Sequence, residues 1–503
     1  MPPSSGEARE GWLILSEGQI NAIVDRVVRQ LSPELREVPQ APVAQPAGPA
    51  GEGPIRARAA PARASMNGAR DGVFDDLEAA IRAAVQSFER WSEVPLEGRG
   101  RAIEAMREAT RKYADELSRL AVEETGLGNV KDKIAKNLLC ANKTPGIEIL
   151  RPQAFTGDYG MTLNERAPFG VIGAITPSTN PTETIINNAI GMVAAGNSVV
   201  FNVHPAAKKV SARHIQLMNE AIAAAGGPEN LVVGLAEPTI ESAQALMKHR
   251  DVRLVVVTGG PAVVRAAMSS GKRAIAAGPG NPPVVVDETA HLERSARDIV
   301  DGASLDNNIV CIVEKEVFAV APIADQLKRL LAENGAVEVT GAAINRLEKL
   351  VVQEGHPARD WIGKDAAKIA QAAGIRAPTE TRLLFAEVDA THPFVQLELL
   401  MPVIGFVRLR DVEECIAAAV QAEHGFGHTA VMHSTNIDHL HAMAKVIDTS
   451  IFVKNGPSYA GLGMTGEGYT SFTIASPTGE GLTTALTFTR ERRCTLKDHF
   501  RIV

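Results

Sequence analysis

The hydrophobic residues between positions 171 and 259 form short β-branched runs that alternate with amphipathic stretches. Four runs have the length of buried strands: 171–176, 198–203, 231–236 and 253–259. Between them, apolar residues recur at helical spacing in three stretches: 182–195, 207–225 and 240–249. Buried strands joined by helical crossovers pair in parallel, so this part of the chain is predicted to form a doubly wound α/β sheet.

Parallel sheets of this kind bind ligands outside the carboxyl ends of their strands. The segments that follow three of the predicted strands are therefore the first places to look for a binding site. They are "TPSTNP" (176–181), "HPAAKK" (204–209) and "TGGP" (258–261). Each is also rich in ordinary turn residues, which is the alternative interpretation.

The chain ahead of this region falls into three parts. Helical patterns are predicted at 71–91 and 97–125, continuing to about residue 150. Residues 33–70 are rich in Pro, Ala and Gly and are predicted to be a linker, because they cannot bury enough apolar surface to offset their ordering entropy. Residues 1–32 contain an amphipathic helix. Its apolar face carries Ile20, Ile23, Val24, Val27, Val28 and Leu31.

The helix at 16–31 begins with a capping box formed by Ser16 and Gln19. One interpretation is a first helix of the globular domain. The long linker favours another, in which a tethered helix buries its apolar stripe on a separate surface. Residues 1–32 are thus predicted to be a docking peptide.

Composition narrows the classes of partner. The chain has 503 residues, of which 45% are hydrophobic and 22% charged, and a net charge of -7. Both signs of charge are interspersed, so there is no basic patch for nucleic acid or anionic lipid. No run approaches the ~20 apolar residues of a membrane span, and no secretory signal pattern is present, so we expect a protein that stays inside the cell.

The four cysteines predict neither a metal site nor a disulfide framework. They lie far apart, with no C-x-x-C pair, at Cys140, Cys311, Cys415 and Cys494. This usage is typical of a reducing compartment.

The segment "GLGMTG" at Gly461, Gly463 and Gly466 satisfies a G-x-G-x-x-G pattern. Its phosphate-binding mechanism requires a strand before it and a helix after it. The following "EGYTSFTIAS" looks extended or looped instead, and we interpret the segment as a loop.

Cys311 lies in "DNNIVCIVEKEVF" (306–318) between polar residues and a β-rich stretch. A lone cysteine is usually inert packing. Here it accompanies three other long motifs: "GVIGAITPSTNPTETIINNAIGMVAAGNSVVF", "ELLMPVIGF" and "FVKNGPSYAGLGMTGEGYTSFTIASPTGEG". On these motifs the chain from about residue 71 to its end resembles the aldehyde dehydrogenase superfamily. It is most similar to the acylating propionaldehyde and acetaldehyde dehydrogenases of bacterial microcompartments.

The resemblance implies roles for individual residues. Cys311 matches the family's nucleophile, and Asn180 matches an amide that stabilises the alkoxide formed on the aldehyde. Glu398 matches a glutamate that holds the nicotinamide ribose. NAD is the expected cofactor, with coenzyme A as co-substrate, and we expect NAD to contact Thr176, Pro177, Ser178, His204, Thr258, Gly259 and Gly260.

Two departures from the superfamily pattern are informative. His204 falls where many relatives place a lysine, so charge at this position does not discriminate NAD from NADP. Ala276 and Ala277 stand where hydrolytic relatives carry a glutamate base. The missing base favours a coenzyme-A-acylating enzyme, with propionaldehyde the favoured substrate. A hydrolytic aldehyde dehydrogenase and a non-catalytic microcompartment assembly protein are the alternatives.

The resemblance also implies an architecture. A Rossmann-type NAD-binding domain is expected over 71–279, interrupted by an oligomerisation hairpin at 150–165. An α/β catalytic domain is expected over 280–465, and a C-terminal return over 466–503. The implied assembly is a homo-dimer or homo-tetramer in the lumen of a cytoplasmic microcompartment, bound to shell or core proteins through residues 16–31.

Overall fold

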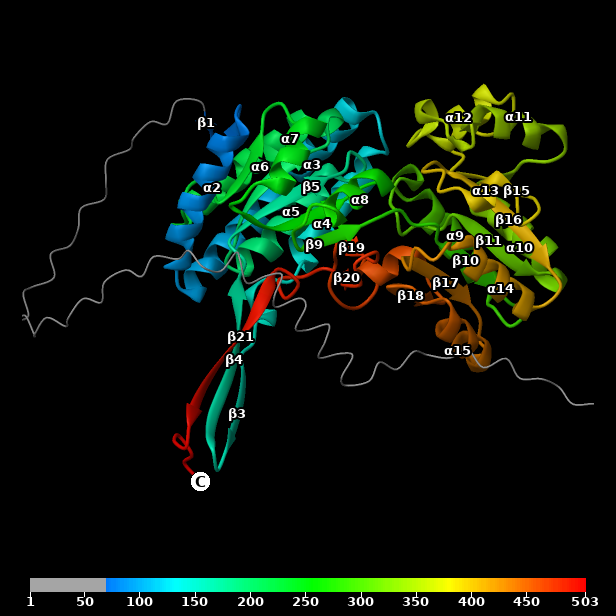
Figure 1. Cartoon of the computed structure of the whole chain (residues 1–503). Helices are drawn as coiled ribbons and strands as arrows, with labels where there is room; N and C mark the ends of the chain where they lie inside the picture. Colours follow the sequence, from blue (N-terminus) through cyan, green and yellow to red (C-terminus); the bar gives the residue numbers. More distant parts are fainter. Residues whose placement is uncertain (1–68) are drawn as a thin grey trace, which may run out of the picture. The chain divides into compact units, whose positions relative to one another are not determined.

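The computed structural model describes residues 69–503, shown in colour in Figure 1. The predicted docking helix at 16–31 lies outside the described residues, as does the linker up to residue 68. The linker was predicted to extend to residue 70, but its last two residues belong to the first sheet. They form strand β1 (Ala69–Arg70), which pairs antiparallel with β2 (Val73–Phe74). Their backbone groups are thus satisfied by a sheet, and the first sheet begins two residues before the predicted boundary.

The first sheet has seven strands in the order β1-β2-β7-β6-β5-β8-β9. From β2 to β9 all neighbours are parallel, as predicted. The remaining strands are β5 (Val171–Thr176), β6 (Ser198–Val203), β7 (Val232–Leu235), β8 (Val252–Thr258) and β9 (Ala274–Ala277). From β5 the chain adds β6 and then β7 on one side of the sheet, and it then returns to add β8 and β9 on the other side of β5. The direction in which strands are added therefore reverses between β5 and β8.

Helices flank this sheet at positions close to those predicted. They are α2 (Leu77–Ser92), α3 (Leu96–Thr125), α4 (Val130–Lys143), α5 (Pro181–Ala194), α6 (Lys208–Ala224), α7 (Ile240–Lys248) and α8 (Pro261–Met268). The predicted helix at 71–91 begins later than expected. Gly72 has a φ of +91°, and the helix starts only after Asp76, whose side chain accepts a hydrogen bond from the N–H of Ala79.

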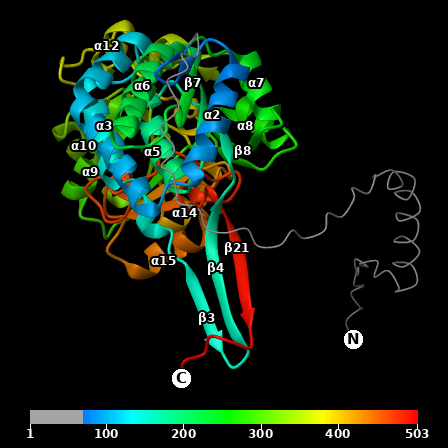
Figure 2. The same cartoon turned by 90° about the vertical axis from the view of Figure 1, so that its left-hand side faces the viewer.

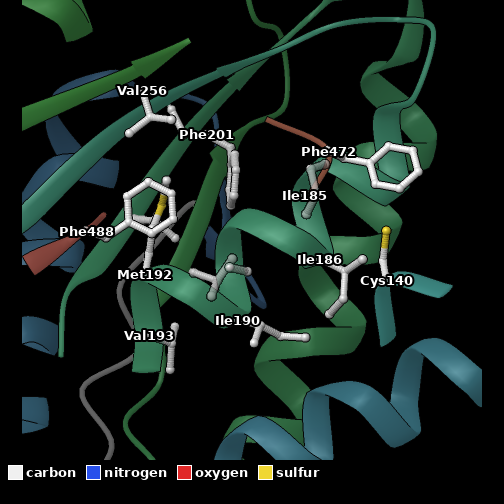
Figure 3. Close-up of a cluster of buried hydrophobic side chains, with 14 of the residues drawn as sticks. Cys140, Ile185, Ile186, Ile190, Met192, Val193, Phe201, Val256, Phe472 and Phe488 are labelled. Atoms are coloured by element: carbon white, nitrogen blue, oxygen red, sulfur yellow. The ribbon is translucent and has the colours of Figure 1, made fainter. Parts of the chain in front are cut away.

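Helix α5 lies in the middle of the first hydrophobic core, with every residue buried. Figure 3 shows its Ile185, Ile186 and Met192 among aromatic side chains that include Phe488 from the C-terminal segment. A Cβ added at Gly191 would lie 3.0 Å from the Phe488 ring, so only glycine fits there without a shift. Packing on all sides fixes α5, and with it the position of its first residues.

The second sheet is also seven-stranded, in the order β12-β15-β16-β11-β10-β17-β18, and every pairing is parallel. Its strands are β10 (Pro283–Val286), β11 (Glu316–Val320), β12 (Ala336–Glu338), β15 (Leu383–Glu387), β16 (Val403–Leu409), β17 (Thr429–His433) and β18 (Ile451–Lys454). Its helices are α9 (Leu292–Ser304), α10 (Ala321–Glu333), α11 (Ala342–Val351), α12 (Ala366–Ala372), α13 (Pro393–Gln396), α14 (Val412–Ala422) and α15 (Ile437–Val446). This sheet has its own core of buried aliphatic and aromatic side chains.

The predicted hairpin is confirmed as a secondary-structure element. Strands β3 (Gln153–Gly157) and β4 (Gly160–Pro168) are antiparallel and joined at Asp158 and Tyr159. The C-terminal strand β21 (Thr489–Lys497) pairs with β4 along its full length, so the three strands form one ribbon (Figure 2).

Short elements complete the described chain. They are the 3-10 turns η1 (Ile147–Ile149), η2 (Pro205–Ala207), η3 (Leu305–Asn308), η4 (Arg359–Trp361) and η5 (Ser458–Leu462), and the pairs β13 (Val352–Gln353) with β14 (His356–Pro357) and β19 (Ile474–Ala475) with β20 (Gly481–Leu482). Within residues 69–503, none of the helices has the length and hydrophobicity needed to cross a bilayer.

Candidate active site

The loop that carries Cys311 begins with a left-handed turn. After α9, Asp306, Asn307 and Asn308 have φ values of +48°, +55° and +64°. Asp and Asn are the residues other than glycine that adopt this conformation most readily. The "DNN" of the sequence therefore directs the chain out of α9 and into the turn that holds Cys311, which is half-buried ahead of β11.

Side chains on both sides of Cys311 hold this loop in place. The Asn308 amide donates to the carbonyl oxygens of Ala303 at 2.7 Å and Glu314 at 3.0 Å. The buried Lys315 ammonium donates to the Asn308 carbonyl at 2.8 Å and to its side-chain oxygen at 2.7 Å. The nucleophile candidate thus lies in a segment whose polar groups are paired within the protein.

Cys311 and Glu398 influence each other electrostatically. The pKa of the Cys311 thiol is raised to about 12, first by burial and then by the negative charge of Glu398, while Lys315 acts in the opposite direction. Burial raises the pKa of Glu398 to about 7, against the effects of Lys315 and of a hydrogen bond from the N–H of Gly280 at 3.4 Å. Two of the predicted site residues are therefore brought together.

Gly280 and His428 lie against the same loop, and sequence reasoning missed both. A Cβ at Gly280 would lie 2.7 Å from the Cys311 carbonyl oxygen and 2.9 Å from Cγ of His428. His428 is buried, with Nδ1 paired to the Thr429 hydroxyl at 2.9 Å and, among residues 69–503, no hydrogen-bond partner at Nε2. Burial lowers the pKa of His428 to about 4, so its imidazole is neutral at pH 7. A histidine before a strand gives no sequence signal that distinguishes it from a core residue.

Asn180 is buried at the start of α5, where it is the residue that precedes the first helical turn. Its side-chain oxygen accepts a hydrogen bond from the Lys136 ammonium at 2.5 Å. Its amide nitrogen lies 3.3 Å from the Thr179 hydroxyl. Lys136 also contacts Asp306, at 2.5 Å, and so connects Asn180 to the turn that precedes Cys311.

The predicted cofactor-binding residues lie at strand ends around the reversal point of the first sheet. Thr176 ends β5 and is followed by Pro177 and Ser178, Thr258 ends β8 and is followed by Gly259 and Gly260, and His204 follows β6. Strands β5 and β8 are neighbours, so two of these three groups lie side by side at the same edge of the sheet, where such sheets bind their ligands. The backbone N–H of His204 bonds to the Thr176 carbonyl at 3.1 Å, which joins the third group to the first.

The local structure at this edge of the sheet fits a dinucleotide. The Thr176 hydroxyl is buried and has no hydrogen-bond partner within the described part of the chain. A Cβ at Gly260 would meet nothing within 4 Å, and Gly260 is the residue from which α8 begins. An open backbone at a helix N-terminus suits a pyrophosphate group. NAD would therefore be held at the ends of β5 and β8, where it would supply a hydride acceptor.

Ala276 and Ala277 form part of β9 and are buried. The N–H of Ala276 is bonded to the Thr478 hydroxyl at 3.0 Å. These two positions place methyl groups, and no carboxylate, where the resemblance implied that a hydrolytic base would stand.

The first two residues of the "GLGMTG" segment end the 3-10 turn η5, and the rest form a loop that no helix follows before residue 475. The Lys143 ammonium binds the carbonyl oxygens of Gly463 at 2.6 Å and Gly466 at 2.9 Å. Backbone carbonyls that face an ammonium cannot serve as a phosphate cradle. Over the described part of the chain, no group of three or more His, Cys, Asp or Glu side chains is arranged to hold a metal ion.

Comparison with known proteins gives a consistent set of relatives. A model of the aldehyde dehydrogenase family matches residues 60–472. The chain is 56% identical to an acetylating acetaldehyde dehydrogenase of Salmonella typhimurium, over 86% of this chain and 94% of the relative. It is 46% identical to a CoA-propanoylating propanal dehydrogenase of the same organism, over 88% of this chain and 96% of the relative.

Two solved structures are similar over most of the chain. One is Rhodopseudomonas palustris propionaldehyde dehydrogenase with bound CoA and an acylated cysteine, at 50% identity and a TM-score of 0.84, covering 86% of this chain and 99% of that one. The other is a propionaldehyde dehydrogenase from the Clostridium phytofermentans fucose utilisation microcompartment, at 48% identity and a TM-score of 0.85, covering 86% and 100%.

Proposed function

Because the chain belongs to the aldehyde dehydrogenase family, we propose that it oxidises a short-chain aldehyde with NAD and transfers the acyl group to coenzyme A. The observation that carries the proposal is the site around Cys311, with Glu398 near it, Asn180 connected to its loop through Lys136 and Asp306, and alanines at 276 and 277. The names of the relatives, which are CoA-acylating enzymes, support it.

In the first step Cys311 reacts as the thiolate, after its thiol proton has passed to solvent: the sulfur adds to the aldehyde carbonyl carbon, and an oxyanion forms on the carbonyl oxygen. The backbone N–H of Cys311 lowers the pKa of its own thiol, and it is the first donor that we propose for the oxyanion. The amide nitrogen of Asn180 is the second. NAD, when bound, would supply the hydride acceptor, so that a thioester would remain on Cys311.

The second step determines the product. Water attacks a thioester slowly unless a positioned base removes its proton, an effect worth about 10²–10⁴ in rate. Ala276 and Ala277 supply no such base. Coenzyme A is a stronger nucleophile, because it attacks as a thiolate and expels the Cys311 thiolate, an exchange that needs no base from the protein.

A burst experiment tests the proposal. With aldehyde and NAD but no coenzyme A, we expect NADH to form at about one equivalent per active site and then to stop, because the acyl group stays on Cys311. Coenzyme A should restore steady turnover and yield acyl-CoA. Continuous NADH formation with free acid as the product would show that a group such as Glu398 activates water, and the hydrolytic alternative would replace this proposal.

We propose propionaldehyde and acetaldehyde as substrates, since the relatives include enzymes named for each. One methylene changes discrimination by only about 1–3 kcal/mol. Comparing kcat/KM for the two aldehydes under identical conditions would rank them, and propionaldehyde is the one that we expect to be favoured.

We also propose that the enzyme works inside a bacterial microcompartment, with residues 16–31 binding a shell or core protein. Support comes from the apolar stripe in the sequence and from the relative of microcompartment origin. Residues 1–32 fused to a fluorescent protein should enter shells, and Ile23→Glu with Val27→Glu should disperse the signal by charging the stripe. A diffuse signal from the unmutated fusion would contradict this role.

A homo-dimer or homo-tetramer built through the β3-β4-β21 ribbon is proposed as the assembly. The ribbon exposes Phe155 at 56% and Leu496 at 40%, and exposed large apolar side chains on one element are typical of an interaction site. Light scattering should show an oligomer for the full chain and a smaller species for Phe155→Glu. A monomeric unmodified chain would overturn the proposed assembly.

A further inference from the structure

Two lysines on one face of α4 are buried next to the candidate active site. Lys133 and Lys136 are three residues apart, and their side chains are 0% and 1% exposed. Lysines at this spacing usually form a solvated helix face. A buried ammonium is costly unless it is paired. Here Asp306 and Glu183, both buried, supply the opposite charges.

Lys136 makes two hydrogen bonds and one further ion pair. Its ammonium donates to the Asn180 side-chain oxygen at 2.5 Å and to an Asp306 carboxylate oxygen at 2.5 Å. A Glu183 carboxylate oxygen lies 3.1 Å away and adds a second negative charge beside the ammonium. Burial alone would lower the pKa of Lys136, but Asp306 and Glu183 raise it well above the usual value. The group therefore keeps its charge at neutral pH.

These contacts determine which way the Asn180 amide faces. An amide can rotate by half a turn and exchange its oxygen and nitrogen. With the ammonium at one side, only the oxygen can lie there, because the NH₂ group would bring donor against donor. The NH₂ group is then directed to the other side, where it lies 3.3 Å from the Thr179 hydroxyl and keeps a hydrogen for a further acceptor.

Lys136 also links the two segments that carry the proposed oxyanion donors. Through Asn180 it contacts the start of α5, and through Asp306 it contacts the turn before Cys311. Asp306 is fixed further by the backbone N–H of Asn129 at 2.8 Å. Lys133 differs from Lys136, since it binds Asp306 and the Thr179 carbonyl but not the Asn180 side chain.

We propose that Lys136 is a positioning residue, which orients the Asn180 amide so that its NH₂ group faces the oxyanion and holds that amide in register with the Cys311 loop. The inference rests on the proposed function, because it requires Asn180 to be an oxyanion donor. Lys136 itself makes no contact with the substrate in this mechanism.

A double-mutant cycle on the full-length enzyme tests the coupling. In the unmodified background, Asn180→Ala should lower the rate constant of the NADH burst by about 10²–10³. In a Lys136→Met background, the Asn180 amide has no fixed orientation, and Asn180→Ala should lower the rate constant of the burst by less than about tenfold. If Asn180→Ala costs the same factor in both backgrounds, the two residues act independently and the inference is overturned.

Removing one buried charge can prevent folding, so the cycle is repeated in a Glu183→Gln background. There, Lys136→Met removes a positive charge after a negative one has already been neutralised, and Lys133 remains paired with Asp306. Glu183→Gln alone is the matched control, since it keeps the Lys136 bond to Asn180. NADH binding, followed by fluorescence, reports whether each variant retains the folded cofactor site.

Lys133→Met is a second control, because Lys133 belongs to the same buried cluster but does not touch the Asn180 side chain. In the Lys133→Met background we expect Asn180→Ala to lower the rate constant of the NADH burst by the full factor of about 10²–10³. An equal loss of coupling in the Lys133 and Lys136 variants would show a general effect of the cluster and overturn the specific role of Lys136. An inert Asn180→Ala in the unmodified enzyme would instead refute the proposed oxyanion role, which is a distinguishable result.

Discussion

Replacing Gly280 by alanine is the most direct test of how tightly the Cys311 loop is held. The new Cβ would lie 2.7 Å from the Cys311 carbonyl oxygen and 2.9 Å from Cγ of the buried His428. Neither neighbour is the free end of a flexible side chain, so the loop or the histidine must move by several tenths of an ångström. Overpacking of this kind costs about 1–3 kcal/mol of stability. A displaced nucleophile can cost up to about 10² in rate.

We therefore expect Gly280→Ala to lower kcat by about ten- to a hundredfold and to lower the unfolding temperature. Steady-state NADH formation with coenzyme A and thermal unfolding measure the two effects. Gly157→Ala is the matched control, because a Cβ there meets no atom within 4 Å and the residue lies in the β3-β4 ribbon. If Gly280→Ala retained kcat within twofold of the unmodified enzyme, the inferred contact would not constrain the nucleophile.

Three further predictions concern separate parts of the chain. Cys311→Ser should abolish turnover while NADH binding persists, and single alanine replacements at the other three cysteines should not; activity in Cys311→Ser would place the nucleophile elsewhere. Deleting residues 1–68 should leave kcat and KM nearly unchanged, and a tenfold loss would show that the segment contributes to catalysis. Burial raises the pKa of Glu314 from 4.5 to about 7. The folded state thus holds this proton more tightly, and stability should fall between pH 4.5 and 7 by about 3 kcal/mol. The free energy of unfolding of Glu314→Gln, measured with urea, should not show this part of the decline with pH. An identical pH dependence in both proteins would refute the prediction.

Much of the first sheet could be predicted because strand and helix periods are local properties of the sequence. Strand β5, for example, begins and ends as predicted at 171 and 176. The start of α2 was predicted too early, because Val73 and Phe74 fit an apolar helix pattern equally well. They form a strand instead because β7 offers their backbone a parallel partner.

The residues that organise the site were harder to predict, because their roles depend on contacts between distant segments. Lys136 and Asp306 are 170 positions apart, and nothing in either local sequence distinguishes a buried ion pair from two solvated charges. His428 gave no signal for the same reason. A usable sequence signal does exist for the turn at Asp306, Asn307 and Asn308. Three consecutive residues that tolerate positive φ, followed by a β-rich stretch, are typical of a left-handed turn.

The charge distribution around Cys311 explains why coenzyme A, whose thiol is itself a strong nucleophile, suits this site as the acyl acceptor. Burial keeps the Cys311 thiol protonated in the free enzyme, and the nearby carboxyl of Glu398, with a pKa of about 7, disfavours a second negative charge. Stabilisation of the oxyanion must therefore supply most of the free energy that drives addition. In the proposed mechanism this stabilisation comes from the Asn180 amide, which Lys136 would orient. Once hydride has left, the thioester is neutral and no longer opposed by Glu398. It then persists until a thiol arrives, since the alanines at 276 and 277 offer water no base.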